Sequence, residues 1–407
     1  MNQPPQDKGA IRETIDTLND FWFGFGSATA LGLFRAVFGT LACLNFLNLS
    51  QMWESWFSER GFVPAWLGQR FLWPQVNLVW LPVEVPRMGL LNGVTDDRIS
   101  LLVFVITFVA AIFTALGLWT RVSTVTLAVG IVSLHHRDAA ILHGGDTVLR
   151  VMSLYLAIAP SGAACSLDRL ISLWKGKTST AITQVSMWPQ RLIAYNCALL
   201  YLTTTWLKWG GHLWQNGTAN WYPARLQEFH RFPVPAFLTN TPTIYFTTYL
   251  TLIVEFALGT LVFYRPLRGW ILFSGLLLHG YIEYSMNIPL FSYLMVSMYI
   301  SFYDGEEIAA WAKRRGAKLN RFKLTVALPK GQKLTQSAGA FLATIDPFCL
   351  VSYVQGDSPE WSAQNHSGKT VPVWRSICGR ALGCWIFGWF PGFWSRFEMK
   401  ALEPISG

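Results

Sequence analysis

The feature that most constrains this chain is a series of long apolar segments. A helix needs about 20 apolar residues to cross the hydrocarbon core of a bilayer, and roughly eight segments approach that length. They are 28–47, 100–119, 122–134, 147–165, 190–208, 244–264, 268–285 and 289–303, of which the third is the shortest. Because backbone polar groups must be satisfied internally in lipid, these segments predict an all-α polytopic membrane bundle of about eight transmembrane helices.

The composition and charge of the chain narrow the class of partner. Of its 407 residues, 52% are hydrophobic and only 14% are charged, whereas soluble domains carry about 25% charged residues. The net charge of +9 comes largely from short basic segments near the predicted span ends, and these lack the arginine–aromatic interleaving of a nucleic-acid groove. We therefore expect membrane lipids as partners and no nucleic acid.

Basic residues in short loops set the expected orientation, because lysine and arginine are retained on the cytoplasmic side. The segments 166–189, 265–268 and 313–323 are basic and fall on one side of an eight-span bundle. This predicts an integral membrane protein, in a bacterial inner membrane, with both termini in the cytoplasm. Segments 48–99, 135–146, 209–243 and 286–288 then face outward.

Three regions follow one another along the chain. Residues 1–24 predict a cytoplasmic lead or interfacial helix, residues 25–312 the membrane domain, and residues 318–407 a small α/β domain. The last region begins with "FKLTVAL", "LTQSAGAFLATID" and "CLVSYV", which predict a strand, a helix and a second strand. That order is typical of the start of a βαβ fold.

Arg35 and Glu255 are two of the charged residues inside the predicted spans. Arg35 occurs in the first span and Glu255 midway along the sixth. A charge at the centre of a membrane helix costs about 2.5–3.5 kcal/mol on insertion scales, so each needs a partner, and the two are candidates to pair with one another. Two interpretations stay open for each: a structural ion pair, or a functional role such as proton handling at Glu255.

The stretch "HHRDAAILHGGD" places His135, His136, Arg137, Asp138, His143 and Asp146 within twelve residues. Histidine and aspartate at such spacing can bind a divalent metal, but the pattern matches none of the zinc motifs, so we predict no metal site. The alternative is a hydrogen-bonded loop in which Asp146 is the N-cap of the next helix.

Lys208 ends the fifth apolar segment in "TTTWLKWGGHLWQNG", and His279 lies in the seventh. A partly desolvated lysine loses its charge more readily and can serve as a general base. The alternative is a lysine whose stem lies along apolar surface while its ammonium reaches water beside Trp206, Trp209 and Trp214. His279 is likewise either a packed core histidine or part of the same site, because the topology puts it at the level of Lys208 and His143.

Several of these motifs occur in the order found in the horizontally transferred transmembrane (HTTM) superfamily. They are "LGLFRAVFG", the histidine-rich stretch from 135, "TTWLKWGGHLWQNG", "LTLIVEFALG" and "LLLHGYIEYSMNIPLFSYLM". The region resembles the membrane domain of vitamin K-dependent gamma-carboxylase. The resemblance implies that Lys208 is a base acting on a quinol, with His143 and His279 as further catalytic candidates. Asp146, Glu255, Arg35 and Arg137 are then supporting residues.

The C-terminal region resembles a degenerate DCC-type thiol-disulfide oxidoreductase domain of the thioredoxin-like class. The two cysteines of that family should fall in or near residues 328–336, which contain none. The resemblance therefore implies a redox-inactive module that docks protein partners.

Two hypotheses follow from the sequence. The first is a carboxylase-like membrane enzyme that uses Lys208 as a general base on a quinol or another lipid-soluble substrate in an outward-facing cavity. The second is a non-catalytic scaffold or accessory subunit that binds lipid, quinone or partner proteins. A pocket that reaches Lys208, with His143 or His279 close by, would favour the enzyme.

Overall fold

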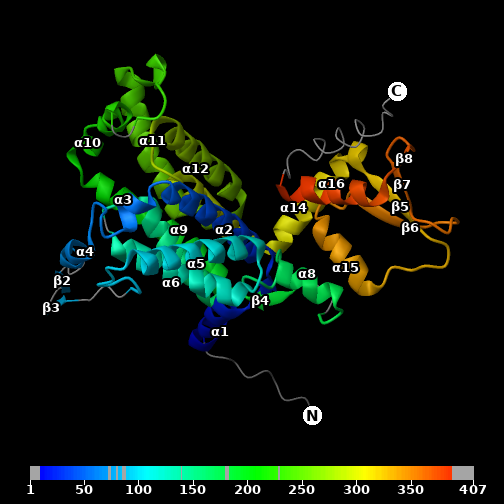
Figure 1. The fold of residues 1–407 in the computed structure, drawn as a ribbon. Coiled ribbons are helices and arrows are strands. Elements are labelled where there is room, and N and C mark those ends of the chain that lie inside the picture. The colour runs from blue at the N-terminus through cyan, green and yellow to red at the C-terminus, as the bar shows by residue number, and fades with distance from the viewer. Residues whose placement is uncertain are drawn as a thin grey trace, which may run out of the picture. The chain divides into compact units, whose positions relative to one another are not determined.

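In the computed structural model the chain forms two compact units, and each is described by itself (Figure 1). The described residues are 10–71, 75–78, 81–84, 89–138, 140–178, 183–227 and 230–386. The first unit combines Met1–Ser166 with Gln184–Tyr303, and the second combines Leu167–Thr183 with Asp304–Gly407. The predicted membrane domain extended to residue 312, but helix α14 (Gly305–Lys318) belongs to the second unit.

A helical segment lies at each of the predicted apolar runs in the described part of the first unit. These segments are α2 (Thr29–Ser50), α5 (Asp97–Leu116), α6 (Thr120–Arg137), α7 (Gly144–Ile158), α9 (Trp188–Trp209), α11 (Thr241–Gly259), α12 (Arg265–Ser285), and α13 (Phe291–Ser297) continued by η6 (Met298–Phe302). The amphipathic helix α1 (Ala10–Phe23) precedes them. The mainly helical fold and the small C-terminal sheet are as predicted.

Among the described helices, α2 and α5 are long and apolar enough to cross a membrane by length and composition. The other helical segments are shorter or carry more polar residues. Helix α6 holds five hydroxyl residues and ends in His135, His136 and Arg137, and α13–η6 forms a shorter apolar helix, Phe291–Phe302.

Neighbouring helices in the chain pack against one another, and one apolar core runs through the unit. Its largest buried side chains include Phe34, Phe38, Phe46, Ile131 and Met152. Helices α2 and α5 approach closely at Gly39, where an added Cβ would lie 2.4 Å from the backbone nitrogen of Ala115. Small residues at such crossings let helix backbones meet, which is how membrane helices gain packing energy without a hydrophobic driving force.

A short antiparallel pairing fixes the direction of two helices. Strand β1 (Phe25–Ser27) pairs with β4 (Gln184–Ser186), and these strands lead directly into α2 and α9. Both helices therefore begin at the same end, which we name the basal end. The distal end is where α2, α6, α9 and α12 finish and α5, α7, α11 and α13 begin.

Short elements belong to the connections at the distal end. They are α3 (Trp53–Phe57), α4 (Ala65–Phe71), the hairpin of β2 (Gln75–Leu78) and β3 (Leu81–Glu84), α10 (His212–Gln215), η1 (Ala219–Trp221), η2 (Pro223–Arg225) and η4 (Ala236–Leu238). At the basal end, η5 (Leu261–Phe263) joins α11 to α12.

The second unit contains a four-stranded sheet in the order β6-β5-β7-β8. Strand β5 (Leu324–Leu328) pairs in parallel with β6 (Val351–Gln355), and α15 (Gln336–Ile345) connects them, so the predicted βαβ unit is present. Strands β7 (Ser362–Asn365) and β8 (Thr370–Val371) add in antiparallel fashion, and α16 (Val373–Ile386) follows. Helix α8 (Leu167–Trp174) packs on α15, with Trp174 edge-on to Phe341 at 5.4 Å between ring centroids.

Candidate functional site

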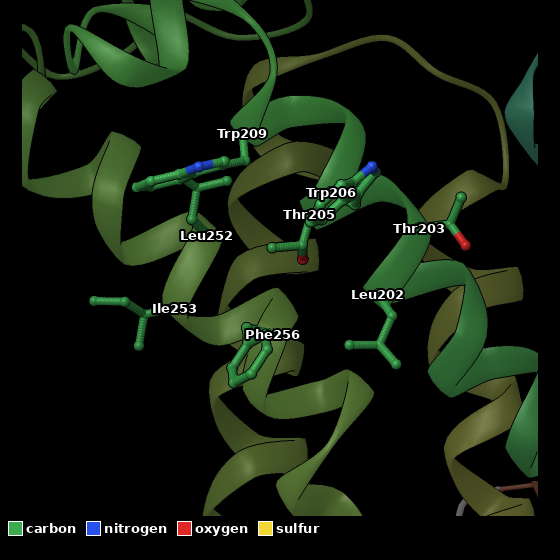
Figure 2. Close-up of a pocket in the computed structure, with 8 residues that line it drawn as sticks. All are labelled: Leu202, Thr203, Thr205, Trp206, Trp209, Leu252, Ile253 and Phe256. Atoms are coloured by element: carbon green, nitrogen blue, oxygen red, sulfur yellow. The ribbon is translucent and has the colours of Figure 1, made fainter.

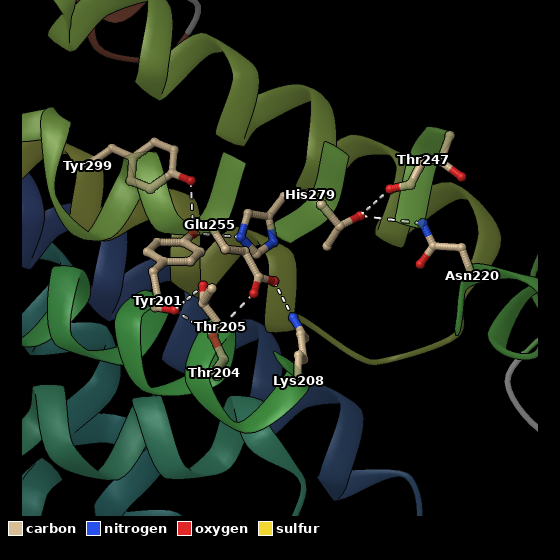
Figure 3. Close-up of polar contacts among 10 residues, drawn as sticks. Tyr201, Thr204, Thr205, Lys208, Asn220, Thr247, Glu255, His279 and Tyr299 are labelled. Atoms are coloured by element: carbon tan, nitrogen blue, oxygen red, sulfur yellow. Dashed lines mark hydrogen bonds and ion pairs between the residues drawn. The ribbon is translucent and has the colours of Figure 1, made fainter. Parts of the chain in front are cut away.

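The centre of the site is an ion pair between the last turn of α9 and the middle of α11. The Lys208 ammonium donates to Glu255 Oε1, and the Thr204 hydroxyl donates to Glu255 Oε2 at 3.3 Å (Figure 3). The Glu255 side chain is only 7% exposed and that of Lys208 28%. The cation also lies at a helix C-terminus, where the helix dipole favours positive charge.

A turn of two glycines returns the chain over the lysine. Helix α9 ends at Gly210, and Gly211 opens the short helix α10. This places the Trp214 ring 5.2 Å from Lys208 Nζ, a cation–π contact. The ammonium therefore has a carboxylate on one side and an aromatic face on another, so it is held in place rather than extended into solvent.

Beside the ion pair lies a buried chain of three aromatic side chains from three elements. The Tyr201 hydroxyl bonds to His279 Nε2 at 2.7 Å and to the Tyr299 hydroxyl at 2.8 Å (Figure 3). His279 is 3% exposed. Its Nδ1 is buried without a hydrogen-bond partner among the described residues. The imidazole thus keeps one nitrogen available for a further partner.

The connection between α9 and α11 is hydrogen-bonded to α11 one and two turns before Glu255. The backbone N–H of Asn220 donates to the Thr248 hydroxyl at 3.2 Å, and its side-chain amide donates to the Thr251 hydroxyl at 3.3 Å. Later in the same connection, Arg231 pairs with Glu283 near the end of α12. These bonds hold the distal connections against the helices that carry the site.

An apolar groove runs between α9 and α11 next to the ion pair (Figure 2). Its volume is about 680 Å³, and it is lined by Leu202, Thr203, Thr205, Trp206, Trp209, Leu252, Ile253 and Phe256. Thr205 and Trp209 flank Lys208 on α9, and Leu252 and Phe256 flank Glu255 on α11. Lys208 and Glu255 themselves are not among the lining residues. The groove is therefore an apolar surface channel with a buried ion pair alongside it.

The histidine-rich stretch forms a second cluster at the start of α7. His143, not Asp146 as predicted, is the N-cap of this helix, because its Nδ1 accepts the Gly145 N–H at 2.9 Å. Asp146 completes a capping box by accepting the His143 N–H at 3.0 Å. Asp146 also lies 3.4 Å from His143 Nε2 and 3.8 Å from His135 Nε2. Among the residues the structure describes, no three potential ligands are grouped to hold a metal ion.

The two clusters share one side chain, Phe291 at the start of α13. A Cβ added to Gly144 would lie 3.6 Å from the Phe291 ring, and the centroid of that ring is 5.7 Å from the centroid of His279. Phe291 therefore lies near both His279 and the start of α7, of which His143 is the N-cap.

The predicted pairing of Arg35 with Glu255 is wrong. Arg35 lies at the basal end, fully buried, and donates to the carbonyls of Thr114, Ala115, Ser161 and Cys165. Two of these carbonyls lie in the last turn of α5 and two in the segment between α7 and α8, so the guanidinium ties the end of α5 to that segment. Glu255 is near the other end of the unit and has Lys208 instead.

Arg137 binds the connection between α2 and α5 at the distal end. It donates to the Val63 carbonyl at 2.7 Å and to the Ser58 carbonyl, and it pairs with Glu59 at 3.3 Å. It therefore fixes the segment between α3 and α4 to the end of α6. Among the residues the structure describes, it forms no hydrogen bond or ion pair with Lys208, Glu255 or His279.

The structure thus brings Lys208, Glu255 and His279 together and adds Tyr201, Tyr299 and Thr204, which the sequence interpretation missed. Tyr201 precedes Lys208 by seven residues, which is two helical turns and hence the same helix face. That spacing was a readable signal for Tyr201. Tyr299 had none, because its contact depends on how η6 packs against α9.

Comparison with known proteins identifies one family. A model of the HTTM domain matches residues 26–306. No curated protein and no solved structure matches the chain.

Proposed function

Because the chain belongs to the HTTM family of membrane proteins, we propose that its first unit is a membrane enzyme in which Lys208 removes a proton from a lipid-soluble quinol. The observation that carries this proposal is the Lys208–Glu255 pair, which lies beside an apolar groove and a hydrogen-bonded tyrosine–histidine chain. The carboxylase resemblance of the lysine motif supplies the substrate class.

Because Lys208 is paired with Glu255, it can lose its proton to the carboxylate without leaving either side chain as an isolated buried charge. In a low-dielectric site, desolvation of both ions offsets much of their attraction. Transfer of one proton from Lys208 to Glu255 leaves a neutral amine next to a neutral carboxylic acid. The amine then accepts the proton of the substrate hydroxyl, and the resulting ammonium stabilises the substrate oxyanion.

The neighbouring residues position this exchange. Thr204 donates to the Glu255 oxygen that does not face Lys208, so the carboxylate keeps its orientation when the lysine turns to the substrate. His279 Nδ1, buried and without a partner among described residues, is available to bond a second oxygen of the substrate. Tyr201 fixes the other nitrogen of that ring at 2.7 Å.

The groove accounts for the lipid solubility of the proposed substrate. Its lining is almost entirely apolar, and Trp206, Ile253 and Phe256 are 78%, 63% and 53% exposed. In a bilayer these side chains face lipid, so an apolar tail enters laterally between α9 and α11. The substrate head group then lies at Thr205 and Trp209, the lining residues that flank Lys208 on α9.

The orientation of the site is part of the same proposal. Arg265 and Arg268 begin α12 at the basal end, and the basic segment 313–323 follows η6 there in sequence. By the retention of basic loops in the cytoplasm, the distal end faces outward and both termini are cytoplasmic. This corresponds to a bacterial inner membrane protein with an outward-facing site.

The test is anaerobic spectroscopic titration of the purified protein in nanodiscs with a naphthoquinol that carries a short isoprenoid tail. Quenching of Trp206 and Trp209 fluorescence reports binding, and the red-shifted absorbance of the quinolate reports deprotonation. We expect Lys208→Met to bind the quinol without forming the anion. Arg225→Met, which removes a cation from the same end, should behave as wild type.

The non-catalytic scaffold is the second candidate, and one observation favours it. The segment between β5 and α15 contains no cysteine, so the second unit lacks a thiol where an oxidoreductase of its fold class would carry its nucleophile. If wild type and Lys208→Met give the same spectra on bound quinol, the base is absent and the scaffold is the better description.

A further inference from the structure

Helix α14 has one buried face and one basic face. Ala312 and Gly316 are buried, and a Cβ added to Gly316 would lie 1.7 Å from the Phe348 carbonyl oxygen. The helix therefore packs tightly against the loop before β6. Positions 310, 314, 317 and 318 point the other way, because they are half a turn from the buried stripe.

The exposed face and the residues after it form a basic surface. Its members are Lys313, Arg314, Lys318, Arg321 and Lys323, all exposed. None of the five forms an ion pair with a described residue. The acidic residues of α14, Glu306 and Glu307, are confined to its first turn, where Glu307 completes the capping box with Asp304. This leaves the C-terminal half of the helix with positive charge only.

The chain limits how far this surface can lie from the bilayer. Asp304, the N-cap of α14, directly follows Tyr303, the C-cap of the last helical segment of the first unit. A 14-residue helix is about 21 Å long, so the backbone of Lys313, Arg314 and Lys318 is tethered within about that distance of the basal end, and Arg321 and Lys323 follow a few residues later.

A second part of the same unit has the composition of an interfacial segment. Helix α8 exposes Ile171 and Trp174, at 42% and 69%, and the exposed Lys175 and Lys177 follow directly. Apolar and aromatic side chains next to lysines are typical of segments that lie at the membrane–water boundary. Helix α8 is also tethered at both ends, because α7 precedes it and α9 follows it.

We propose that the basic surface of α14 and residues 321–323 binds the head groups of anionic phospholipids and so holds the second unit on the bilayer. Charge complementarity carries the inference, since clustered lysine and arginine next to a membrane segment are attracted to an anionic leaflet. The exposed aromatic side chain of α14, Trp311, packs edge-on against Phe348, so the basic surface lacks the series of stacking aromatics that binds single-stranded nucleic acid. The proposal does not depend on the chemistry of Lys208.

Amine labelling of the full-length protein in nanodiscs tests this surface. The protein is reacted with a water-soluble acetylating reagent in phosphatidylcholine discs with and without phosphatidylglycerol, and labelling is read by mass spectrometry. Lys313, Lys318 and Lys323 should label at least about fivefold more slowly in the anionic discs, as expected from the attraction of one basic side chain to such a surface. Lys330, Lys333 and Lys369, which are exposed elsewhere on the unit, are internal controls.

Salt and charge reversal separate the possible outcomes. Protection should disappear at high ionic strength, because exposed charges are then screened, and in the variant Arg314→Glu/Arg321→Glu. The matched variant Lys330→Glu/Lys333→Glu should keep it. If the three lysines label rapidly in both kinds of disc, the surface is free. If they are protected equally in both, the surface is covered by protein. Either result overturns the proposal.

Discussion

Lys208 and Glu255 are 47 positions apart in the sequence and form an ion pair that joins α9 to α11. The pair is the main polar contact between these helices near the distal end. It gives the buried carboxylate a counter-charge and fixes the ammonium next to the apolar groove. Stability and the proposed chemistry therefore depend on the same two side chains.

Lys208→Ala should lower the free energy of unfolding by about 3 kcal/mol, because removal of one partner leaves a buried carboxylate without its counter-charge. The double variant Lys208→Met/Glu255→Leu should recover most of that loss, since both charges are then absent. Thermal unfolding in detergent, followed by circular dichroism, gives the two values. A double variant that is less stable than Lys208→Ala would contradict the assignment.

Arg35→Lys should lower stability by about 3 kcal/mol while leaving quinol binding unchanged. The guanidinium serves four carbonyls, two at the end of α5 and two in the segment between α7 and α8, and a lysine ammonium cannot reproduce that planar set of donors. The measurement is chemical unfolding together with fluorescence titration at the distal end. Loss of binding in a folded Arg35→Lys protein would place the residue in the site after all.

Gly39→Ala and Gly280→Ala should change stability in opposite directions. A Cβ at Gly39 would collide with the backbone of α5, whereas nothing lies within 4 Å of a Cβ at Gly280 in α12. The first change should destabilise by about 2 kcal/mol through overpacking, and the second should stabilise by about 0.5–1 kcal/mol through helix propensity. Parallel melting curves of the two variants decide this, and a Gly39→Ala variant as stable as wild type would argue against the close approach of α2 and α5.

Asp138 should make the protein less stable as pH rises. Burial raises the pKa of this carboxyl above its ordinary value of 3.8, against the opposing effects of the Ala140 N–H and Arg137. Below pH 3.8 both the folded and the unfolded chain bind the proton, so the stability that the protonated Asp138 side chain contributes is fully present. That contribution is lost as pH rises through the pKa of the folded state.

Asp138→Asn keeps the oxygen that accepts the Ala140 N–H and carries no charge. Its advantage in unfolding free energy over wild type should therefore grow as pH increases above 3.8. Asp357→Asn, at an exposed position, is the control. A difference between Asp138→Asn and wild type that does not vary with pH would contradict the titration.

Cys349 should react slowly with iodoacetamide at pH 8. The residue reaches the surface, but partial burial of the thiol, and then the nearby Asp346, raise its pKa, while Lys313 lowers it. Less thiolate is present than in an unstructured peptide, and Lys313→Gln should slow alkylation further. Rates obtained by mass spectrometry test this, and a thiol as fast as a peptide cysteine would reopen a redox role for the second unit.

Much of the architecture was readable from local patterns. The apolar runs located the helical segments of the first unit, because a run of about 20 apolar residues has few alternatives to a helix. The strand–helix–strand pattern after residue 322 located the parallel pair β5 and β6. Both inferences use residues close together in sequence, which is where composition and periodicity carry information.

The pairing of polar residues was less accessible. Arg35 and Glu255 were opposite charges in apolar runs, but the depth of each in the unit depends on where its helix begins. The β1–β4 pairing sets the start of α2, whereas α11 begins only after the long connection from α9. Glu255 instead forms an ion pair with Lys208, a residue that the sequence predicted at a helix end. The N-cap of α7 was displaced by three residues, because His143 provides a ring nitrogen that accepts the Gly145 N–H.

The insertion of α8 into the second unit has a consequence for how the chain is made. Helix α8 leaves the ribosome between α7 and α9, but α15, the helix it packs on, is translated only after the whole first unit. During that interval the apolar face of α8 has no partner from its own unit. The second unit can therefore be completed only after translation has passed Ile345. A chain that stops earlier leaves α8 uncovered and accessible to proteases.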